Sequence, residues 1–349
     1  MKYRSLGRSG LRVSEIAMGT FTFGGKGDFA MVGKQGVKEA KRLVDCSIDN
    51  GVNLFDCANM YSLGLAEEIL GEVIEGREDV LVTSKVRMKI GDGPNDEGAS
   101  RYHILRECER SLKRLRRDHI DIYYLHEWDG ATPLDETLEA MDILVRHGKV
   151  RYIGCSNYSG WHTMKALAEA DRHGLARFAT QQIHYTLEAR EAEYELLPIA
   201  VDQGLGTLVW SPLAAGLLSG KHRRDNEPAA GSRQARGWTE PPIREEERLW
   251  RIVDVLVELA DARGATPAQM ALAWLLDRPS ITSLVVGGSS TGQFEENFGA
   301  VDLDLTDEER SRLDEASAIP LLYPYWHQSN FAIDSFTPAD KALMPERFR

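Results

Sequence analysis

The sequence of 349 residues predicts a single α/β domain, a (β/α)8 barrel of the TIM type. Short β-branched runs alternate with longer helical patterns from about residue 36 to residue 300, which is typical of βαβ units around a parallel sheet. The strand candidates number eight, and several helical patterns end at a glycine, as at Gly51, Gly148, Gly174 and Gly204. The chain is longer than the usual ~250 residues of such barrels, which accommodate inserted loops.

The elements follow in order. Residues 1–16 predict a β-hairpin, because the turn at residues 6–10 separates two short extended pieces. The barrel is expected over residues 17–317. Its strands are expected at residues 16–18, 52–55, 80–84, 120–125, 150–154, 178–182, 207–210 and 283–286. Helices are expected at residues 36–50, 65–75, 99–116, 135–147, 161–173, 191–203, 244–263 and 267–277.

Two segments depart from this strand–helix rhythm. Residues 219–243 are rich in Gly, Pro and Arg, and form a long loop between the seventh strand and its helix. Residues 318–349 form a C-terminal tail. Long segments of this kind are typically functional lids or disordered, and the aromatic content of the tail predicts that it is ordered and packed. Its aromatic residues are Tyr323, Tyr325, Trp326, Phe331 and Phe336.

Composition excludes several classes of partner. The net charge of −12 argues against a nucleic-acid or acidic-membrane surface, where a basic footprint is expected. The four cysteines show no CxxC spacing, which indicates a reducing compartment. No apolar stretch approaches the roughly 18 residues of a membrane span, and the N-terminus does not resemble a signal peptide. We therefore expect a cytoplasmic protein with no membrane partner; a homo-oligomer stays open.

Four polar residues each fall just past a strand candidate or on the loop that follows it: Asp56, Tyr61, Lys85 and His126. The carboxyl ends of parallel strands share one rim, where α/β barrels carry their chemistry. A phenol, an ammonium, a carboxylate and an imidazole in one pocket suit proton transfer to a carbonyl oxygen. Taken singly, Asp56 could be a helix cap and His126 a core histidine, so the spacing alone leaves the function open.

The quartet allows a division of roles. Tyr61 can protonate a carbonyl oxygen if its pKa falls from about 10 toward neutrality, which a neighbouring Lys85 ammonium would promote. Asp56 would pair with Lys85, and a neutral His126 would donate a hydrogen bond to the carbonyl oxygen. Nothing in this set attacks carbon, so the electron pair must come from elsewhere, and hydride from a nicotinamide cofactor is the expected source. No GxGxxG or Walker loop follows a strand, so the barrel rim would have to hold the cofactor. No metal-ligand spacing is present, and no metal is expected.

The surrounding segments resemble the aldo-keto reductases over nearly the whole chain, from residue 6 to residue 297. The resemblance implies an NADPH-dependent reduction of an aldehyde or ketone, with Tyr61 as general acid. The matching segments are FDCANMY with Ala66-Glu67-Glu68 around Tyr61, TSKV around Lys85, LHEWD around His126, and GKVRYIGCSN at residues 148–157.

The resemblance also implies a cofactor site. Ser156, Asn157 and Gln182 would bind the nicotinamide carboxamide, and Trp210 would stack on its ring. Gly19 and Thr20 follow the first strand, and the cations Lys221 and Arg233 lie on the inserted loop. The turn that approaches the pyrophosphate would contain Ser211, Pro212, Leu213, Gly216 and Leu217. The adenosine-binding face would contain Gly287, Ser289, Gln293, Glu296 and Asn297. Phe21, Trp128 and the aromatic tail are expected to wall the substrate.

The stretch from Ser289 to Gln293 has no cation, although many relatives carry one there for the 2′-phosphate of NADPH. This arrangement resembles the subgroup of many bacterial reductases and potassium-channel β subunits, in which an arginine matching Arg233 helps with phosphate. We expect NADPH, with NADH as the alternative. Three other functions stay open: oxidation of a sugar or polyol alcohol, a non-enzymatic regulatory role, and a barrel lyase or isomerase without nicotinamide.

Overall fold

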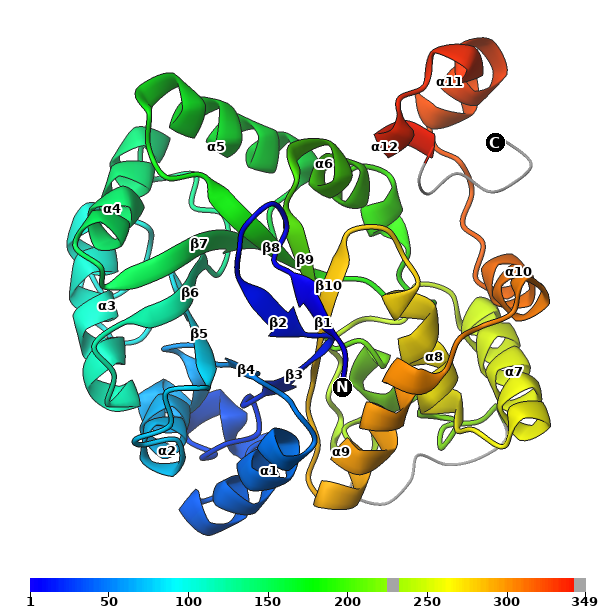
Figure 1. Ribbon diagram of the computed structural model, residues 1–349, viewed down its shortest axis with the longest axis horizontal. Helices are drawn as coiled ribbons and strands as arrows, with labels where there is room; N and C mark the ends of the chain where they lie inside the picture. The colour runs from blue at the N-terminus through cyan, green and yellow to red at the C-terminus, as the bar shows by residue number, and fades with distance from the viewer. Residues whose placement is uncertain (225–231, 342–349) are drawn as a thin grey trace.

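The computed structural model describes residues 1–224 and 232–341, and it confirms the predicted fold class. Eight parallel strands close into a barrel in the order β10-β3-β4-β5-β6-β7-β8-β9, with helices around the outside (Figure 1). The strands are β3 (Ile16–Gly19), β4 (Leu54–Asp56), β5 (Leu81–Val86), β6 (Ile120–Leu125), β7 (Val150–Ser156), β8 (Phe178–His184), β9 (Gly206–Trp210) and β10 (Ile281–Val286).

The helices that cover the barrel start and end largely where the sequence predicts them. The predicted helix at residues 191–203 is an exception, because a short 3-10 turn, η3 (Glu191–Glu193), precedes α6. Pro198 has no N–H and fits within the first turn of a helix, so α6 begins two residues before it. The helices are α1 (Val37–Asp49), α2 (Leu65–Val73), α3 (Arg101–Leu115), α4 (Leu134–Arg146), α5 (Gly160–His173), α6 (Leu196–Gln203), α7 (Glu246–Arg263), α8 (Pro267–Leu276), α9 (Thr291–Phe298) and α10 (Asp307–Ala316).

A hairpin of β1 (Tyr3–Ser5) and β2 (Arg12–Ser14) lies across the amino-terminal end of the barrel (Figure 1). Leu6 and Val13 are fully buried in one cluster with inward-facing residues of the strands, among them Leu54 and Ile122. The turn approaches the barrel so closely that a Cβ at Gly7 would lie 2.4 Å from the backbone nitrogen of Gly206. The hairpin therefore closes the end of the barrel opposite the site described below.

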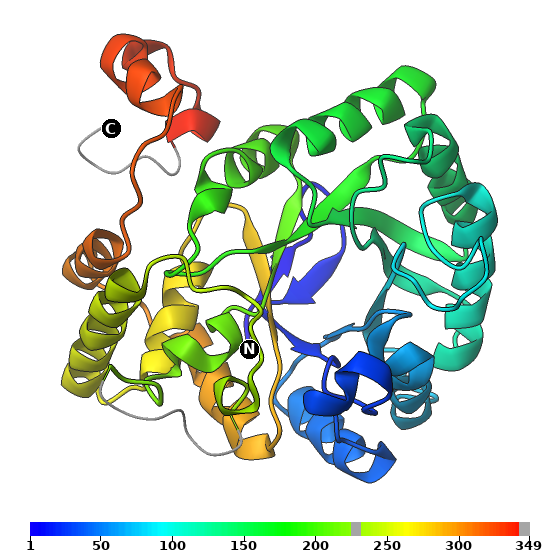
Figure 2. The ribbon, with the colours of Figure 1, turned by 180° about the vertical axis from the view of Figure 1, so that it is seen from behind.

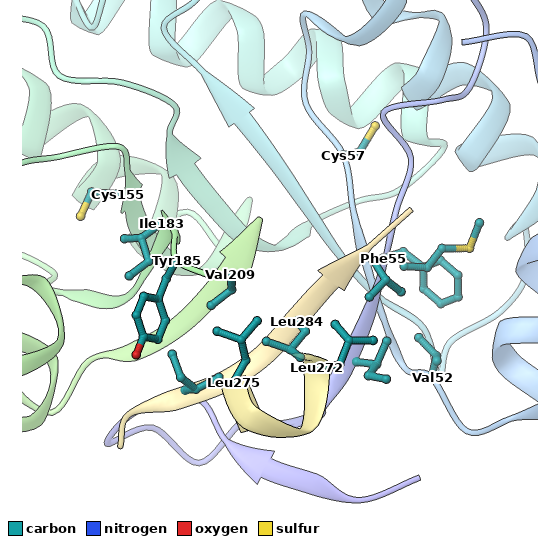
Figure 3. Close-up of a cluster of buried hydrophobic side chains, with 14 of the residues drawn as sticks. Val52, Phe55, Cys57, Cys155, Ile183, Tyr185, Val209, Leu272, Leu275 and Leu284 are labelled. Atoms are coloured by element: carbon teal, nitrogen blue, oxygen red, sulfur yellow. The ribbon is translucent and has the colours of Figure 1, made fainter. Parts of the chain in front are cut away.

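The outer faces of the strands pack beneath the helices in a second and larger apolar cluster. Figure 3 shows Leu272 and Leu275 of α8 beside Leu284 of β10, with Val209 of β9 next to them. These side chains are fully buried, so the strands are apolar on both faces. This explains why their sequences are short apolar runs with little alternation.

The C-terminal tail packs only in part, which differs from the expectation. Its helices α11 (Tyr325–Phe331) and α12 (Pro338–Lys341) lie to one side of the barrel, beyond α6 and α10 (Figures 1 and 2). Tyr325 stacks on Tyr194 with ring centroids 5.3 Å apart, but Tyr323 and Phe331 are 74% and 75% exposed. Two such short helices present too little surface to bury all the aromatic rings of the tail.

Within the described ranges, no helix combines the length and the apolar character that crossing a membrane requires.

Because the β1–β2 hairpin closes one end of the barrel, we expect its buried residues to contribute to the free energy of unfolding. Leu6→Ala should lower the free energy of unfolding by about 2–5 kcal/mol, because it opens a cavity at the base of the barrel. Leu322→Ala is the matched control: this leucine is 52% exposed and its truncation should change stability by less than about 0.5 kcal/mol. Urea unfolding of the three proteins measures both effects. Equal midpoints for Leu6→Ala and the parent would show that the hairpin does not stabilise the barrel.

Candidate active site

One cavity of about 1020 Å³ opens at the carboxyl ends of the strands, the end that faces the viewer in Figure 2. The residues that line it come from almost every strand end and from the loops after β3, β9 and β10. Among the residues singled out in the sequence, the lining contains Gly19, Phe21, Asp56, Tyr61, His126, Ser156, Asn157, Gln182, Trp210, Ser211, Pro212, Leu213, Gly216, Lys221, Arg233, Gly287, Ser289, Gln293, Glu296 and Asn297.

A buried ion pair lies at the floor of the cavity. Lys85 Nζ lies 2.6 Å from Asp56 Oδ2, and their side chains are 0% and 3% exposed. Thr83 Oγ1 and Gln182 Nε2 donate to Asp56 Oδ1 at 2.6 and 2.8 Å. Strands β4, β5 and β8 supply these groups, so the pair holds three strand ends together.

All three protons of the Lys85 ammonium have acceptors. Besides Asp56, Nζ donates to the carbonyl of Cys57 at 2.8 Å and to Tyr61 Oη at 3.3 Å. An ammonium has three donors and no acceptor, so two of them fix its position and the third points at the phenol. The arrangement places a full positive charge beside the oxygen of Tyr61.

The pKa values of this pair differ from the sequence-based expectation. Burial lowers the pKa of Lys85, but Asp56 and Tyr61 outweigh it and the net pKa is raised, so the ammonium stays charged. Burial raises the pKa of Tyr61 to about 12, against the lowering effect of Lys85. The expected fall of the Tyr61 pKa toward neutrality is therefore wrong for this structure. The reason is that Asp56 already compensates the lysine charge, while desolvation penalises the phenolate in full.

His126 presents a neutral imidazole to the same cavity. Burial, with smaller effects from Lys85 and Arg87, holds the pKa of His126 well below its usual value. Its ring lies edge-on to that of Tyr61, with centroids 5.9 Å apart. Its Nδ1 is buried without a hydrogen-bond partner in the described part of the protein. The imidazole thus offers one N–H donor and no charge to a neighbouring oxygen atom.

The loop that carries Tyr61 is strained and anchored. Tyr61 begins a 3-10 turn, η2 (Tyr61–Gly64), in which Ser62 and Leu63 adopt φ values of 51° and 56°. Ser62 Oγ accepts from the N–H of Gly25 and donates to the carbonyl of Phe23, both on the loop after β3. Left-handed backbone at non-glycine residues persists where surrounding contacts hold it, commonly near functional sites.

A buried ionic network lies behind this loop. Glu67 of α2 is fully buried, accepts from Ser84 Oγ at 2.5 Å, and pairs with Arg114 Nε of α3 at 2.6 Å. Glu107, also fully buried, accepts from Asn59 Nδ2 at 3.2 Å. Ser84 directly precedes Lys85, and Asn59 lies two residues before Tyr61. The two carboxylates therefore tie the backbone around both residues to helices α2 and α3.

The polar groups expected to hold a nicotinamide carboxamide are not equivalent. Asn157 Nδ2 donates to the carbonyl of His126 at 3.1 Å, and its Oδ1 accepts from Trp210 Nε1 at 2.9 Å. Gln182 Nε2 is committed to Asp56. Ser156 Oγ, by contrast, is buried with no partner among the described residues. An amide group of a ligand would satisfy this hydroxyl, so the residues present fit a carboxamide there.

The turn after β9 has the backbone of an anion-binding loop, with positive φ at Ser211, Ala214, Ala215 and Gly216. Three of its amides are nevertheless bonded inside the turn. The N–H groups of Ala214 and Gly216 donate to the carbonyls of Ser211 and Leu213, and that of Ala215 donates to Ser211 Oγ. The turn is thus rigid before any ligand binds, and Leu217 is buried beneath it.

Arg233 supplies a cation to this part of the cavity. Its guanidinium lies 5.6 Å from the ring centroid of Phe21, and Nη2 lies 4.0 Å from where a Cβ would stand at Gly287. Burial lowers its pKa, while Glu240 opposes the shift. In residues 1–224 and 232–341 it has no ion-pair partner, so its charge is available to an anionic ligand.

The far end of the cavity is formed by the loop after β10 and the start of α9. Gln293 Oε1 accepts from the N–H and hydroxyl of Ser289, and Gln35 Nε2 donates to the carbonyl of Gly288. Sequence reasoning missed the loop after β3, because residues 22–35 carry no periodic pattern. The lining residues it missed include Asp28, Phe29, Val32, Lys34, Met60, Met88, Glu127, His222, Gln234, Arg236, Trp238 and Glu240.

Four of the residues singled out lie elsewhere. Thr20, Lys85 and Leu217 are buried behind the cavity wall. Trp128, expected to wall the substrate, stacks on His162 of α5 with ring centroids 4.0 Å apart and does not line the cavity. No described residue of the C-terminal tail lines it either. The loop after β6 turns the indole of Trp128 outward over α5, which sequence position alone does not reveal.

No group of three or more metal-ligating side chains occurs within the two described ranges.

The comparisons with known proteins agree with this geometry. A model described as the aldo/keto reductase family matches residues 15–318. An oxidoreductase of Bacillus subtilis (strain 168), YrpG, described as uncharacterized, is 42% identical over 320 residues, covering 88% of this chain and 93% of the relative. Probable voltage-gated potassium channel β subunits of Arabidopsis thaliana and Oryza sativa subsp. japonica are 37% and 38% identical over 310 residues, covering 87% of this chain and 92% of each relative.

The neutral state of His126 predicts a pH dependence of stability. Above pH 6.5 this residue is neutral in both states; below it the unfolded chain binds a proton and the folded protein does not. Stability should therefore fall as pH falls below 6.5, with a slope of about 1.4 kcal/mol per pH unit from this residue.

Urea unfolding of the parent and of His126→Gln between pH 7.5 and 5 measures this contribution as a difference in slope. His147→Gln, which alters an exposed imidazole, is the matched control and should leave the slope unchanged. If the free energy of unfolding depended on pH in the same way in the parent and in His126→Gln, the imidazole would not be neutral in the folded protein.

Proposed function

The chain belongs to the aldo/keto reductase family and is an NAD(P)-dependent oxidoreductase, and from this premise we propose that it reduces an aldehyde or ketone to an alcohol with NADPH. The observation that carries the proposal is the third hydrogen bond of Lys85, which points at Tyr61 Oη beside a neutral His126. Tyr61 and His126 share one cavity with Ser156 and Arg233; within the described residues the Ser156 hydroxyl has no hydrogen-bond partner and Arg233 forms no ion pair.

The bound NADPH would supply hydride to the carbonyl carbon. Ser156 Oγ would bind the carboxamide of the nicotinamide, and Trp210 would lie against its ring. Arg233, which forms no ion pair with any described residue, would pair with a phosphate. NADH is the alternative donor, because residues 287–297 carry no cation for a 2′-phosphate.

The proton comes from the protein. The substrate carbonyl oxygen would accept hydrogen bonds from Tyr61 and from the N–H of His126, which together stabilise the negative charge that develops on it. Burial keeps Tyr61 protonated at neutral pH, and its role as general acid depends on the Lys85 ammonium, which lowers the cost of forming the phenolate. When the proton leaves Oη, the Lys85 ammonium stabilises the phenolate, and Asp56 keeps the ammonium in place.

The same groups would act in reverse during the oxidation of an alcohol, with Tyr61 as the base. The direction in the cell depends on the ratio of the two cofactor forms. Oxidation of a sugar or polyol alcohol is therefore kept as the alternative reaction of this site.

A second candidate function is a regulatory subunit that binds the cofactor without turnover. It is favoured by the similarity to the two proteins described as probable potassium channel β subunits. The complete Lys85–Asp56–Tyr61 arrangement supports the enzyme instead, because a purely regulatory site has no need of a proton donor.

The proposal also concerns the setting of the protein. Its partner would be a small carbonyl compound in the cytoplasm, where the free Cys46, Cys57, Cys108 and Cys155 would stay reduced. We propose no nucleic-acid or membrane partner, and assembly into a homo-oligomer is compatible with the mechanism.

Tyr61→Phe tests the proton donor. This variant should lose at least about 100-fold in kcat for aldehyde reduction, because no other group in the site delivers the proton. Its NADPH affinity, measured by the quenching of protein fluorescence, should change less than twofold. Tyr3→Phe, which alters an exposed phenol on β1, is the matched control and should retain full activity.

The outcomes separate the candidate functions. Undiminished turnover in Tyr61→Phe would contradict the proposed mechanism. NADPH binding by the parent protein without turnover of any aldehyde, ketone or sugar in a broad panel would favour the regulatory role. Absence of binding of either nicotinamide cofactor would favour a lyase or isomerase.

Arg233→Gln tests the phosphate contact. The guanidinium lies next to Phe21, whose ring contacts Tyr61 at 5.2 Å, so it is close to the reacting end of the cavity. This position favours the pyrophosphate, which NADPH and NADH share. The variant should weaken the binding of both cofactors by about 10- to 150-fold, in line with a lost charge-assisted contact of roughly 1.5–3 kcal/mol.

Arg223→Gln, on the same loop but outside the cavity, is the matched control and should bind both cofactors normally. Fluorescence titrations with NADPH and NADH give the Kd of each variant relative to the parent for each cofactor, four ratios in all. Loss of NADPH affinity alone would assign Arg233 to the 2′-phosphate instead.

A further inference from the structure

Glu127 is a cavity-lining carboxylate that forms no ion pair with any described residue, next in the chain to the histidine that faces the substrate. It lines the same cavity as Tyr61 and His126 and is half-buried. Consecutive Cα atoms are about 3.8 Å apart, so its side chain begins within one residue of the group that would hold the substrate oxygen. The proposed mechanism assigns it no role.

The hydrogen bonds of Glu127 leave one oxygen open. Its Oε1 accepts from the N–H of Trp128 at 3.1 Å. No other hydrogen bond and no ion pair within 4.0 Å involves this carboxylate in the described part of the chain. Burial raises its pKa, while Trp128 and Arg87 lower it. Arg87 acts on Glu127 only through its electrostatic field, since no ion pair joins them and Arg87 does not line the cavity, so a substrate meets the carboxylate and not the guanidinium.

The other acid at this end of the cavity is neutralised. Asp56 forms an ion pair with Lys85 and accepts two further hydrogen bonds, so both of its oxygens are engaged and its charge is compensated. Around the reacting carbonyl the lining also contains the apolar or neutral residues Phe21, Met60, Met88, Tyr61 and His126, and the cation Arg233 next to Phe21. Because Arg233 is assigned above to a phosphate of the cofactor, Glu127 is the charged group left for a substituent on the carbonyl carbon.

We propose that Glu127 is a specificity-determining residue that rejects carbonyl substrates carrying a carboxylate or phosphate beside the carbonyl and favours those carrying hydroxyl groups there. This inference rests on the proposed reductase function and names its substrate class: uncharged, hydroxylated aldehydes or ketones. Like charges a few ångströms apart in a partly desolvated site disfavour binding by an order of magnitude or more. A hydroxyl group, in contrast, donates to the open Glu127 oxygen.

The test uses matched small substrates. Glyoxylate and methylglyoxal are of similar size and differ in the charge next to the aldehyde, and glyceraldehyde and propanal differ in hydroxyl groups. In Glu127→Gln the ratio of kcat/KM for methylglyoxal to that for glyoxylate should fall by about tenfold relative to the parent. In Glu127→Leu the ratio for glyceraldehyde to propanal should also fall several-fold. Differences in intrinsic reactivity between the two substrates of a pair do not affect the comparison, because each ratio is compared between the variant and the parent.

Glu97→Gln is the matched control. It removes the same charge from an exposed position on the loop after β5, outside the cavity, and should leave both ratios unchanged. NADPH affinity should be the same in all variants, which shows that each protein is folded and loaded.

Two failures are distinguishable. If the parent reduces propanal and methylglyoxal but the ratios do not move in the Glu127 variants, the role of Glu127 is wrong and the reductase function stands. The role is equally wrong if Glu97→Gln shifts the ratios as far as Glu127→Gln. If the parent binds NADPH and reduces none of the four compounds or a wider panel of ketones and sugars, the proposed function itself fails.

Discussion

The buried ion pair between Lys85 and Asp56 is the constraint on which the rest of this site depends. Removing two charges from water costs several kcal/mol per ion, and their attraction offsets this cost only when the remaining donors and acceptors are also satisfied. Thr83 of β5, Gln182 of β8 and the carbonyl of Cys57, which directly follows β4, meet that requirement. The closed barrel is what brings these strand ends together, because each contributes one group to a common rim.

The ion pair also influences the charge states of the neighbouring side chains at the rim. The ammonium is held in place by two contacts and directs its third at Tyr61, and its charge also helps to keep His126 neutral. The site thus holds Lys85 as a charged ammonium beside Tyr61 and His126, which both stay neutral. Burial maintains this difference at neutral pH, since it opposes charge on Tyr61 and on His126 alike.

Support for the site comes from outside the barrel as well. Glu67 and Glu107 link the backbone beside Lys85 and Tyr61 to helices α2 and α3, with Arg114 between the two carboxylates. The opposite end of the barrel is closed by Leu6 of the hairpin. The cavity therefore lies in a rigid frame, and the long loop after β9 contributes Arg233 and Trp238 as its outer wall. In such a fold, loops such as the one carrying Glu127 can vary without disturbing the strand ends that hold Lys85 and Asp56.

The sequence by itself determined the barrel and the location of its chemistry. Alternating apolar runs and helical patterns are local properties, and in a parallel barrel the residue after each run must lie on the carboxyl rim; this is why Asp56, Lys85 and His126 could be placed together. What only the tertiary structure decided concerns contacts between distant segments. The amide of Gln182 is bound to Asp56, 126 residues away, and that of Asn157 lies between His126 and Trp210. The pKa of Tyr61, the outward turn of Trp128 and the open oxygen of Glu127 likewise depend on burial and on neighbours from other strands. Local patterns carry no information about desolvation, so these features could be found only once the strands were assembled.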